Sequence, residues 1–212
     1  MIITIILSNI LEYNLIKSPW SDYYKTTLNK EPNKTVIYAV KQFREQINKT
    51  ALDIGSGTGC DSVYLLENGF CVKALDQDIN AIEILKNKIR NLYQNKVTYE
   101  HTLIQNYDIG VNTYDLINAS FSLPFCNKSD FVNIWKNIYK GLKSNGIFSG
   151  QVFGVNDDWS NISDMSFVTN EEVDDLLIGY NPEYYIEIDE DGKIADGTIK
   201  HWHLFNLVIR KK

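Results

Sequence analysis

Apolar and polar residues recur with two different periods along the middle of the chain. Short apolar runs alternate with longer segments in which apolar residues return every three or four positions. The short runs predict buried strands, and the second pattern predicts amphipathic helices. Strands that alternate with helices in this way are typical of a parallel sheet covered on both faces. The pattern therefore predicts an α/β fold.

The predicted elements of this part share one feature, which is that each strand is followed by a turn signal or a helix start. The strands are expected at residues 50–54, 71–75, 97–101, 114–119 and 147–153. The helices are expected at 34–47, at 60–66, after a cap at Asp78 or Asn80, and from Ser129 or Asp130 to a stop at Asn145 and Gly146.

The pattern changes after the fifth strand. Thr169 is followed three residues later by Glu172, which predicts a capping box and a helix to residue 177. Two further strands, at 184–188 and 200–209, are separated by an acidic turn signal. They predict an antiparallel hairpin at one edge of a seven-stranded, mostly parallel sheet. We expect residues 34–212 to form one domain, preceded by an N-terminal segment at 1–33.

Composition and charge narrow the range of partners. The chain has 212 residues, a net charge of −6 and one short basic run at its end. An acidic chain without a basic cluster is a poor binder of nucleic acids or anionic membranes. The three cysteines, Cys60, Cys71 and Cys126, cannot all pair and form no C-x-x-C motif. Reduced thiols in a cytoplasmic protein are therefore expected.

The first eleven residues are rich in Ile and Leu. They contain no positive residue before the apolar run and no small-residue cleavage site, which argues against a secretory signal. The run is also shorter than the ~20 residues that span a bilayer. The sequence leaves open whether this segment is a packed strand, a packed helix or the result of an upstream start.

The most informative motif is the turn at residues 51–59. A short apolar strand runs into Gly55, Gly57 and Gly59, and a helical pattern follows at once. A strand, a glycine turn and a helix place a ligand over a helix N-terminus, and glycine lets the backbone approach it. The dinucleotide fingerprint G-x-G-x-x-G requires its third glycine at position 60, where this chain has Cys60.

The residues around this turn resemble motif I of the class I S-adenosylmethionine-dependent methyltransferases, in which an acid, here Asp53, precedes the glycines. Asp76 closes the second predicted strand, where a carboxylate can accept both ribose hydroxyls of an adenosine. Nicotinamide-binding folds use an acid in the same way, so Asp76 alone does not choose the cofactor. Its alternative role is that of an acid at the N-terminus of the next helix.

Other segments resemble small bacterial class I methyltransferases of the tellurite-resistance-like group. They are Trp20 to Tyr24, Ser120 to Phe125, Gln151 to Gly154, Asp157 to Trp159 and Lys200 to His203. This resemblance implies a Rossmann-like fold, S-adenosylmethionine as cofactor and a small-molecule acceptor.

The resemblance also implies which residues bind the cofactor. They are Asp53, Gly55, Ser56, Gly57, Gly59, Asp76, Gln77, Thr102, Leu103 and Ala119. Asp53 is expected under the methionine moiety, either orienting the ammonium of the ligand or anchoring the turn. An acid that often contacts adenine after the third strand is replaced here by Thr102 and Leu103, so backbone groups and apolar packing are expected to hold the base.

A second set of residues is expected on the acceptor side of the site. Tyr23 and Tyr24 are candidates for a lid, and the acceptor candidates are Ser120, Phe121, Phe125 and Trp159. Ordinary packing over the cofactor is the alternative for these aromatic groups. The Asn-Pro-Pro-aromatic motif of enzymes that methylate nucleobases or glutamine amides is replaced here by residues 118–121, which lack both prolines. We expect a small-molecule acceptor.

His201 and His203 share one face of the last predicted strand, and Trp202 faces the other way. The sequence places no third ligand beside them, so no metal site is expected.

No residue can be assigned as the general base. Two rival functions remain: a cofactor-binding sensor or partner domain without catalysis, and a nicotinamide oxidoreductase. Cys60 and the C-terminal hairpin disfavour the oxidoreductase.

Overall fold

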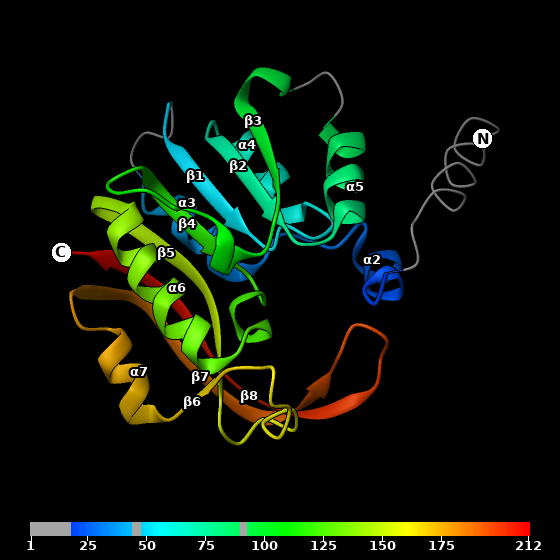
Figure 1. Ribbon diagram of the computed structural model, residues 1–212, viewed down its shortest axis with the longest axis vertical. Helices are drawn as coiled ribbons and strands as arrows, with labels where there is room; N and C mark the ends of the chain where they lie inside the picture. The colour runs from blue at the N-terminus through cyan, green and yellow to red at the C-terminus, as the bar shows by residue number, and fades with distance from the viewer. Residues whose placement is uncertain (1–17, 44–47, 90–92) are drawn as a thin grey trace.

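The computed structural model describes residues 18–43, 48–89 and 93–212, and the structural statements below concern these residues. A twisted sheet runs through the molecule in the order β3-β2-β1-β4-β5-β8-β7, with a short strand β6 beside the end of β5 (Figure 1). The strands are β1 (Thr50–Ile54), β2 (Cys71–Asp76), β3 (Val97–His101), β4 (Tyr114–Ala119), β5 (Leu142–Gly154), β6 (Phe167–Val168), β7 (Tyr180–Lys193) and β8 (Ile199–Lys211).

The sheet has a parallel part and an antiparallel edge. Strands β1 to β5 pair in parallel, and the strand order reverses between β1 and β4. β8 pairs antiparallel with both β5 and β7. The α/β class and the C-terminal hairpin predicted from the sequence are therefore confirmed. Strand β6 was not predicted, and β5, β7 and β8 are longer than expected.

Helices cover both faces of the sheet (Figure 1). They are α2 (Ser21–Thr27), α3 (Lys34–Lys41), α4 (Cys60–Glu67), α5 (Ile79–Ile89), α6 (Lys128–Gly141) and α7 (Asn170–Leu176), with 3-10 turns η1 (Gln94–Lys96), η2 (Ile104–Asn106) and η3 (Leu123–Phe125). One apolar core joins α6 to the sheet, and a second joins the sheet to α3, α4 and α5. None of these helices is long and apolar enough to cross a bilayer.

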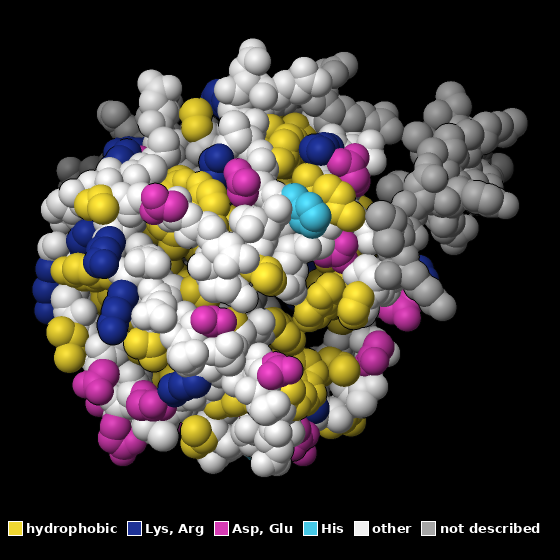
Figure 2. Space-filling view, in the orientation of Figure 1, with side chains coloured by type: hydrophobic (Ala, Val, Ile, Leu, Met, Phe, Trp, Pro, Cys, Tyr) yellow, Lys and Arg dark blue, Asp and Glu magenta, His cyan; other side chains and the backbone are white. Residues whose placement is uncertain are grey.

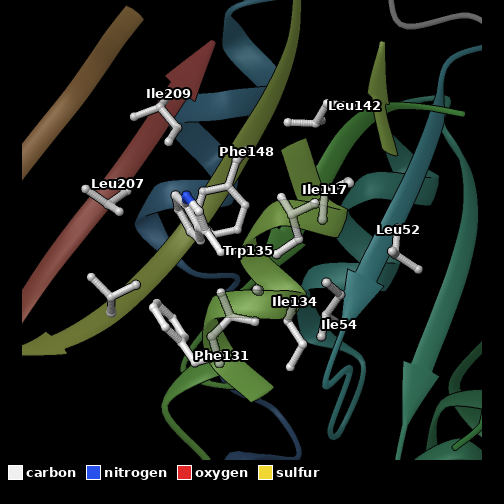
Figure 3. Close-up of a cluster of buried hydrophobic side chains, with 14 of the residues drawn as sticks. Leu52, Ile54, Ile117, Phe131, Ile134, Trp135, Leu142, Phe148, Leu207 and Ile209 are labelled. Carbon is white, nitrogen blue, oxygen red and sulfur yellow. The ribbon is translucent and has the colours of Figure 1, made fainter. Parts of the chain in front are cut away.

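Helix α6 shows how apolar spacing produces this packing. Phe131, Ile134, Trp135 and Ile138 recur at helical spacing and are all buried. The first three point into the core toward side chains of the sheet (Figure 3), and Ile138 belongs to the same core. Burial of one such side chain contributes about 1.5–3 kcal/mol to the free energy of unfolding. The spacing alone therefore determines which side of α6 faces the sheet.

The ends of α6 differ from those expected. Its N-cap is Asn127, whose side chain accepts the backbone N–H of Asp130, so the predicted start at Ser129 or Asp130 lies inside the first turn. The helix ends at Gly141, and Leu142 begins β5 directly. A side chain at Gly141 would place its Cβ 2.3 Å from Ile109, so the close approach of helix and core requires glycine there.

Two predicted helix starts are confirmed by their hydrogen bonds. The Asp78 carboxylate accepts the backbone N–H of Asn80 at 2.9 Å at the start of α5. Thr169 and Glu172 form the predicted capping box of α7. Helix α3 ends at Lys41, and the rest of the predicted helix 34–47 lies partly outside the described residues, as does the apolar segment at residues 1–11.

Candidate cofactor and acceptor site

The glycine turn lies at the carboxyl end of β1, beside the point where the strand order reverses. Its three glycines all have left-handed backbones, with φ of 68°, 51° and 79°. An added Cβ at Gly55 would lie 2.4 Å from the Cβ of Ser122, and one at Gly59 would lie 2.3 Å from Leu85. An added Cβ at Gly57 would have the Gly55 carbonyl oxygen as its nearest neighbour, at 3.9 Å. This part of the turn is therefore open.

The turn is tied to the end of β2. The backbone N–H groups of Gly55 and Ser56 donate to the carbonyl of Leu75, and that of Gly57 donates to the Asp76 carboxylate at 2.8 Å. The other oxygen of Asp76 accepts the N–H of Asp78, also at 2.8 Å. Asp76 therefore lies against the open side of the turn, and Asp78, not Asp76, makes the side-chain bond that caps α5.

Asp53 is held in a buried polar network below the turn. The residue is 2% exposed, and its carboxylate accepts hydrogen bonds from Ser62 on α4 and from Asn118 on β4. The Asn118 amide also donates to Asp61 at 3.0 Å. Burial, with the nearby Asp61 carboxylate, raises the pKa of Asp53 to about 7. Asp53 thus anchors α4 and β4, whereas the amides of the turn bond to β2.

The remaining predicted cofactor residues differ in burial and in bonding. Ser56 has a buried hydroxyl with no hydrogen-bond partner in the described part of the chain, and Leu103 is 40% exposed after β3. Thr102 donates its backbone N–H to the carbonyl of Asp76 at 3.0 Å, and the carbonyl of Gln77 lies 3.1 Å from His101 Nε2. Ala119 is fully buried in the core beside α6.

Helix α2 lies across the glycine turn. The carbonyl of Thr27 accepts the hydroxyl of Thr58 at 3.0 Å, which ties the end of α2 to the turn. Tyr24 is buried in a small apolar cluster with residues of α5, whereas Tyr23 is 40% exposed. Figure 1 shows α2 beside α5, on the side where β1 and β2 end. The predicted lid residues are thus placed next to the turn.

The predicted acceptor residues meet in one aromatic cluster. The ring of Phe125 lies 5.0 Å from that of Trp20 and 6.2 Å from that of Trp159, between ring centroids. Phe121 has an unusual left-handed backbone, with φ of 51°, and its N–H donates to the side chain of Gln151 at 3.0 Å. The hydroxyl of Ser120 points to Asn118 instead, at 3.4 Å.

Three members of this region were missed by the sequence reasoning. Phe153 and Trp202 complete the aromatic cluster, with ring centroids 5.7 Å apart, and Gln151 is fully buried beneath Phe121. The alternation of β8 did place Trp202 opposite to the two histidines. No local signal identified Gln151, because its partners Asn33 and Asn206 are distant in the sequence.

The two histidines of β8 contact carboxylates of β7. His201 lies 2.7 Å from Asp189 and 2.8 Å from Asp191, and these carboxylates raise its pKa. His203 Nδ1 accepts the backbone N–H of Asn156 at 3.0 Å, so its proton is on Nε2, which faces Glu187.

Ligand atoms of Glu187, Asp189 and His203 lie within 4.8 Å of one another, which is close enough for a metal site. A metal on His203 Nε2 would require the imidazole to lose its only proton, because Nδ1 already accepts an N–H. The bonding of this ring therefore favours carboxylate pairing over metal coordination.

Comparison with known proteins agrees with this architecture. Residues 51–146 match the model of a family described as a methyltransferase domain. The structure of TehB from Haemophilus influenzae has a TM-score of 0.73 at 21% identity, and the match covers 91% of this chain and 66% of that one. A protein from Listeria monocytogenes described as an S-adenosylmethionine-dependent methyltransferase has a TM-score of 0.63 at 20% identity, over 83% and 97% of the two chains. Comparison with curated proteins gives no match.

The sheet order and the glycine turn define the Rossmann-like fold of the class I methyltransferases. Together with the match of residues 51–146 to the methyltransferase-domain model, they support an S-adenosylmethionine-dependent methyltransferase with S-adenosylmethionine as cofactor. The residues present fit this cofactor. The open side of Gly57 leaves room for a ligand, and the unpartnered hydroxyl of Ser56 and the carboxylate of Asp76 border that space.

Proposed function

We propose that the chain transfers the methyl group of S-adenosylmethionine to a small-molecule acceptor, beneath a lid formed by the N-terminal segment. The observation that carries this proposal is the contact of Trp20, just before α2, with Phe125 of the aromatic cluster. Because α2 also lies on the glycine turn through Thr27, one short segment reaches both the cofactor side and the acceptor side of the site. Such a cover leaves little space for a macromolecular acceptor.

When bound, the cofactor supplies a methyl group already activated by its sulfonium. The protein then has to provide proximity, alignment and the exclusion of water. In this proposal Asp76 accepts the ribose hydroxyls, and Ser56 and the backbone at Gly57 hold the methionine moiety. Asp61 supplies negative charge below the turn for the ammonium group, together with Asp53, which is only partly ionised at neutral pH because its pKa is raised to about 7. The rings of Phe121 and Phe125 favour a positive sulfur nearby.

Charge supports the choice of a small acceptor. The net charge is −6, and in Figure 2 most basic side chains gather at the left of the face shown, with no continuous basic track across it. A protein that methylates nucleic acids needs such a track to neutralise phosphates.

We place residues 1–33 as the lid segment and 34–212 as the catalytic domain. The three cysteines are free, which supports a reducing, cytoplasmic location.

The test uses cofactor labelled at the methyl group and a bacterial extract split by size. We expect label in one or a few small molecules and none in the protein or nucleic-acid fractions. Formation of S-adenosylhomocysteine should depend on the small-molecule fraction. Label in a macromolecular fraction would overturn the proposed acceptor class. Tight cofactor binding without any transfer would instead favour a sensor or partner domain.

A further inference from the structure

The loop that follows β5 is fastened to strand β8 although it contains no helix or strand up to β6. The backbone N–H of Asn156 donates to His203, and the N–H of Asp158 donates to the carbonyl of His201 at 3.1 Å. In return, the N–H of His201 donates to the Asp158 carboxylate at 2.7 Å. Residues 156–158 and the start of β8 therefore form one interlocked unit.

Asp157 lies at the centre of this unit. Its side chain is completely buried. One carboxylate oxygen accepts the N–H of Trp159 at 3.0 Å and the ammonium of Lys200, and the other accepts the N–H of His203 at 3.2 Å. These bonds hold Trp159 close to β8.

The ammonium of Lys200 is enclosed by aromatic rings. Its Nζ lies 4.0 Å from the ring centroid of Trp159, 4.1 Å from that of Trp202 and 5.5 Å from that of Phe153. The side chain is 5% exposed, and its one hydrogen-bond partner among the described residues is Asp157. Aromatic faces around a cation, with a carboxylate beside them, are the composition of an ammonium-binding cage. Here the protein's own lysine fills the cage.

The rings of this cage continue into the acceptor side of the proposed site. Trp202 lies 6.0 Å from Phe121, and Trp159 lies 6.2 Å from Phe125, between ring centroids. Phe121 lies two residues after the end of β4 and has a strained left-handed backbone. A shift of either tryptophan would therefore remove one of the rings packed against Phe121 or Phe125.

We propose that Lys200 and Asp157 are positioning residues for methyl transfer. The positive charge of Lys200 draws Trp159 and Trp202 together, and these rings hold Phe121 and Phe125 in place against the acceptor. Neither Lys200 nor Asp157 needs to touch the cofactor or the acceptor. This inference rests on the proposed function, because the acceptor side of the site is itself part of that proposal.

The first test asks whether charge, rather than bulk, is required inside the cage. Lys200→Ala removes a group equivalent to n-propylammonium, and 1-propanol has the same carbon chain without the charge. We expect methyl transfer to the small-molecule fraction to fall by at least about tenfold, because the variant breaks a buried ion pair. Affinity for S-adenosylhomocysteine should stay within about threefold of that of the parent. Added n-propylammonium should restore transfer, and 1-propanol should not.

A second variant guards against misfolding of the first. Lys200→Met keeps the apolar stem of the side chain and removes its charge. The rings of Trp159 and Trp202 lie 5.7 Å apart at 62°, so they should give a coupled near-ultraviolet circular dichroism signal. We expect this signal to weaken in Lys200→Met. It should persist in Lys128→Met, which removes the partly exposed ion pair with Glu172.

The inference would be overturned by parent-like transfer and an unchanged tryptophan signal in Lys200→Met. Equal rescue of Lys200→Ala by 1-propanol, or no rescue by either compound, would also overturn it. Failure of the proposed function has a different signature. In that case the parent protein itself transfers no label to the small-molecule fraction, while ammonium-dependent recovery of the tryptophan signal still reports on the cage.

Discussion

At the scale of single residues, the three positions of the turn require glycine for different physical reasons. Side chains at positions 55 and 59 would collide with Ser122 and Leu85, so packing excludes them. An added Cβ at Gly57 would meet only the Gly55 carbonyl oxygen, at an ordinary contact distance of 3.9 Å, so the backbone conformation alone disfavours another residue. The sequence motif could not distinguish these cases, because Ser122 and Leu85 come from other parts of the chain. Gly57 is therefore the position where a substitution reports on the ligand.

Gly57→Val should fold and lose affinity for the cofactor. The new side chain would occupy the open side of the turn, where we place the methionine moiety. The matched control is Gly197→Val, because Gly197 also has a left-handed backbone, with φ of 91°, and no atom within 4 Å of an added Cβ. Both variants should lose similar stability from backbone strain, about 1–2 kcal/mol or somewhat more for a branched side chain. Calorimetry with S-adenosylhomocysteine should show weak binding for Gly57→Val alone. Equal affinities of the two variants would show that the methionine moiety does not lie at the open side of the turn.

A second residue-scale prediction concerns the raised pKa of Asp53, which is about 7. An ordinary aspartate titrates near pH 4, so between about pH 4 and 7 the folded protein binds a proton that the unfolded chain has released. This group therefore makes the folded protein less stable as the pH rises through that window, and its effect is level above it. Urea unfolding at pH 5 and pH 8 should show a smaller loss of stability in Asp53→Asn than in the parent. An identical loss would assign the pH dependence to other groups.

At the scale of elements, apolar periodicity correctly predicted the order of strands and helices from α3 onward except for β6, and it missed α2. The ends of the elements were predicted less accurately. The acidic run from Asp189 to Asp191 was interpreted as a turn, but it lies within β7. Acidic residues are uncommon in strands, yet these carboxylates sit on an exposed edge and two of them pair with His201 across the hairpin. Such cross-strand pairing depends on register, which the pattern of a single segment does not contain. The buried bonds of Asp53 and Gln151 were missed for the same reason.

The end of β2 and the start of α5 meet at two aspartates with separate roles. Asp76 bonds to the glycine turn, and Asp78 caps the helix. Asp76→Ala should lower affinity for S-adenosylhomocysteine by at least about tenfold, because charge-assisted hydrogen bonds contribute ~1.5–3 kcal/mol. It should also lower stability, since the partly buried N–H groups of Gly57 and Asp78 lose their acceptor. Asp78→Ala should cost about 1 kcal/mol of stability through loss of the cap, with nearly unchanged affinity. Parallel calorimetry and urea unfolding separate the two roles, and equal affinity losses would contradict them.

At the scale of the whole molecule, the site is built from parts that lie far apart in the sequence. The glycine turn comes from the first half of the parallel sheet, the tryptophan cage comes from the antiparallel edge, and α2 spans the region between them. Motif I and the acid after β2 were visible in the sequence because each is local. The meeting of Trp20 with Phe125, and of Trp202 with Phe121, depends on the order of the strands in the sheet.

Closure by α2 gives the last prediction. If α2 covers bound cofactor, then hydrogen exchange at residues 18–27 should slow when S-adenosylhomocysteine is added, because ligand contacts stabilise the closed arrangement. A chain that begins after Thr27 should bind the ligand more weakly, since it lacks Trp20, Tyr23 and Tyr24. Exchange at the tip of the β7–β8 hairpin, around Gly197, serves as the internal control and should not change. Unchanged exchange in α2 together with full affinity in the shortened chain would show that α2 does not cover the site. A macromolecular acceptor would then fit the site better than a small one.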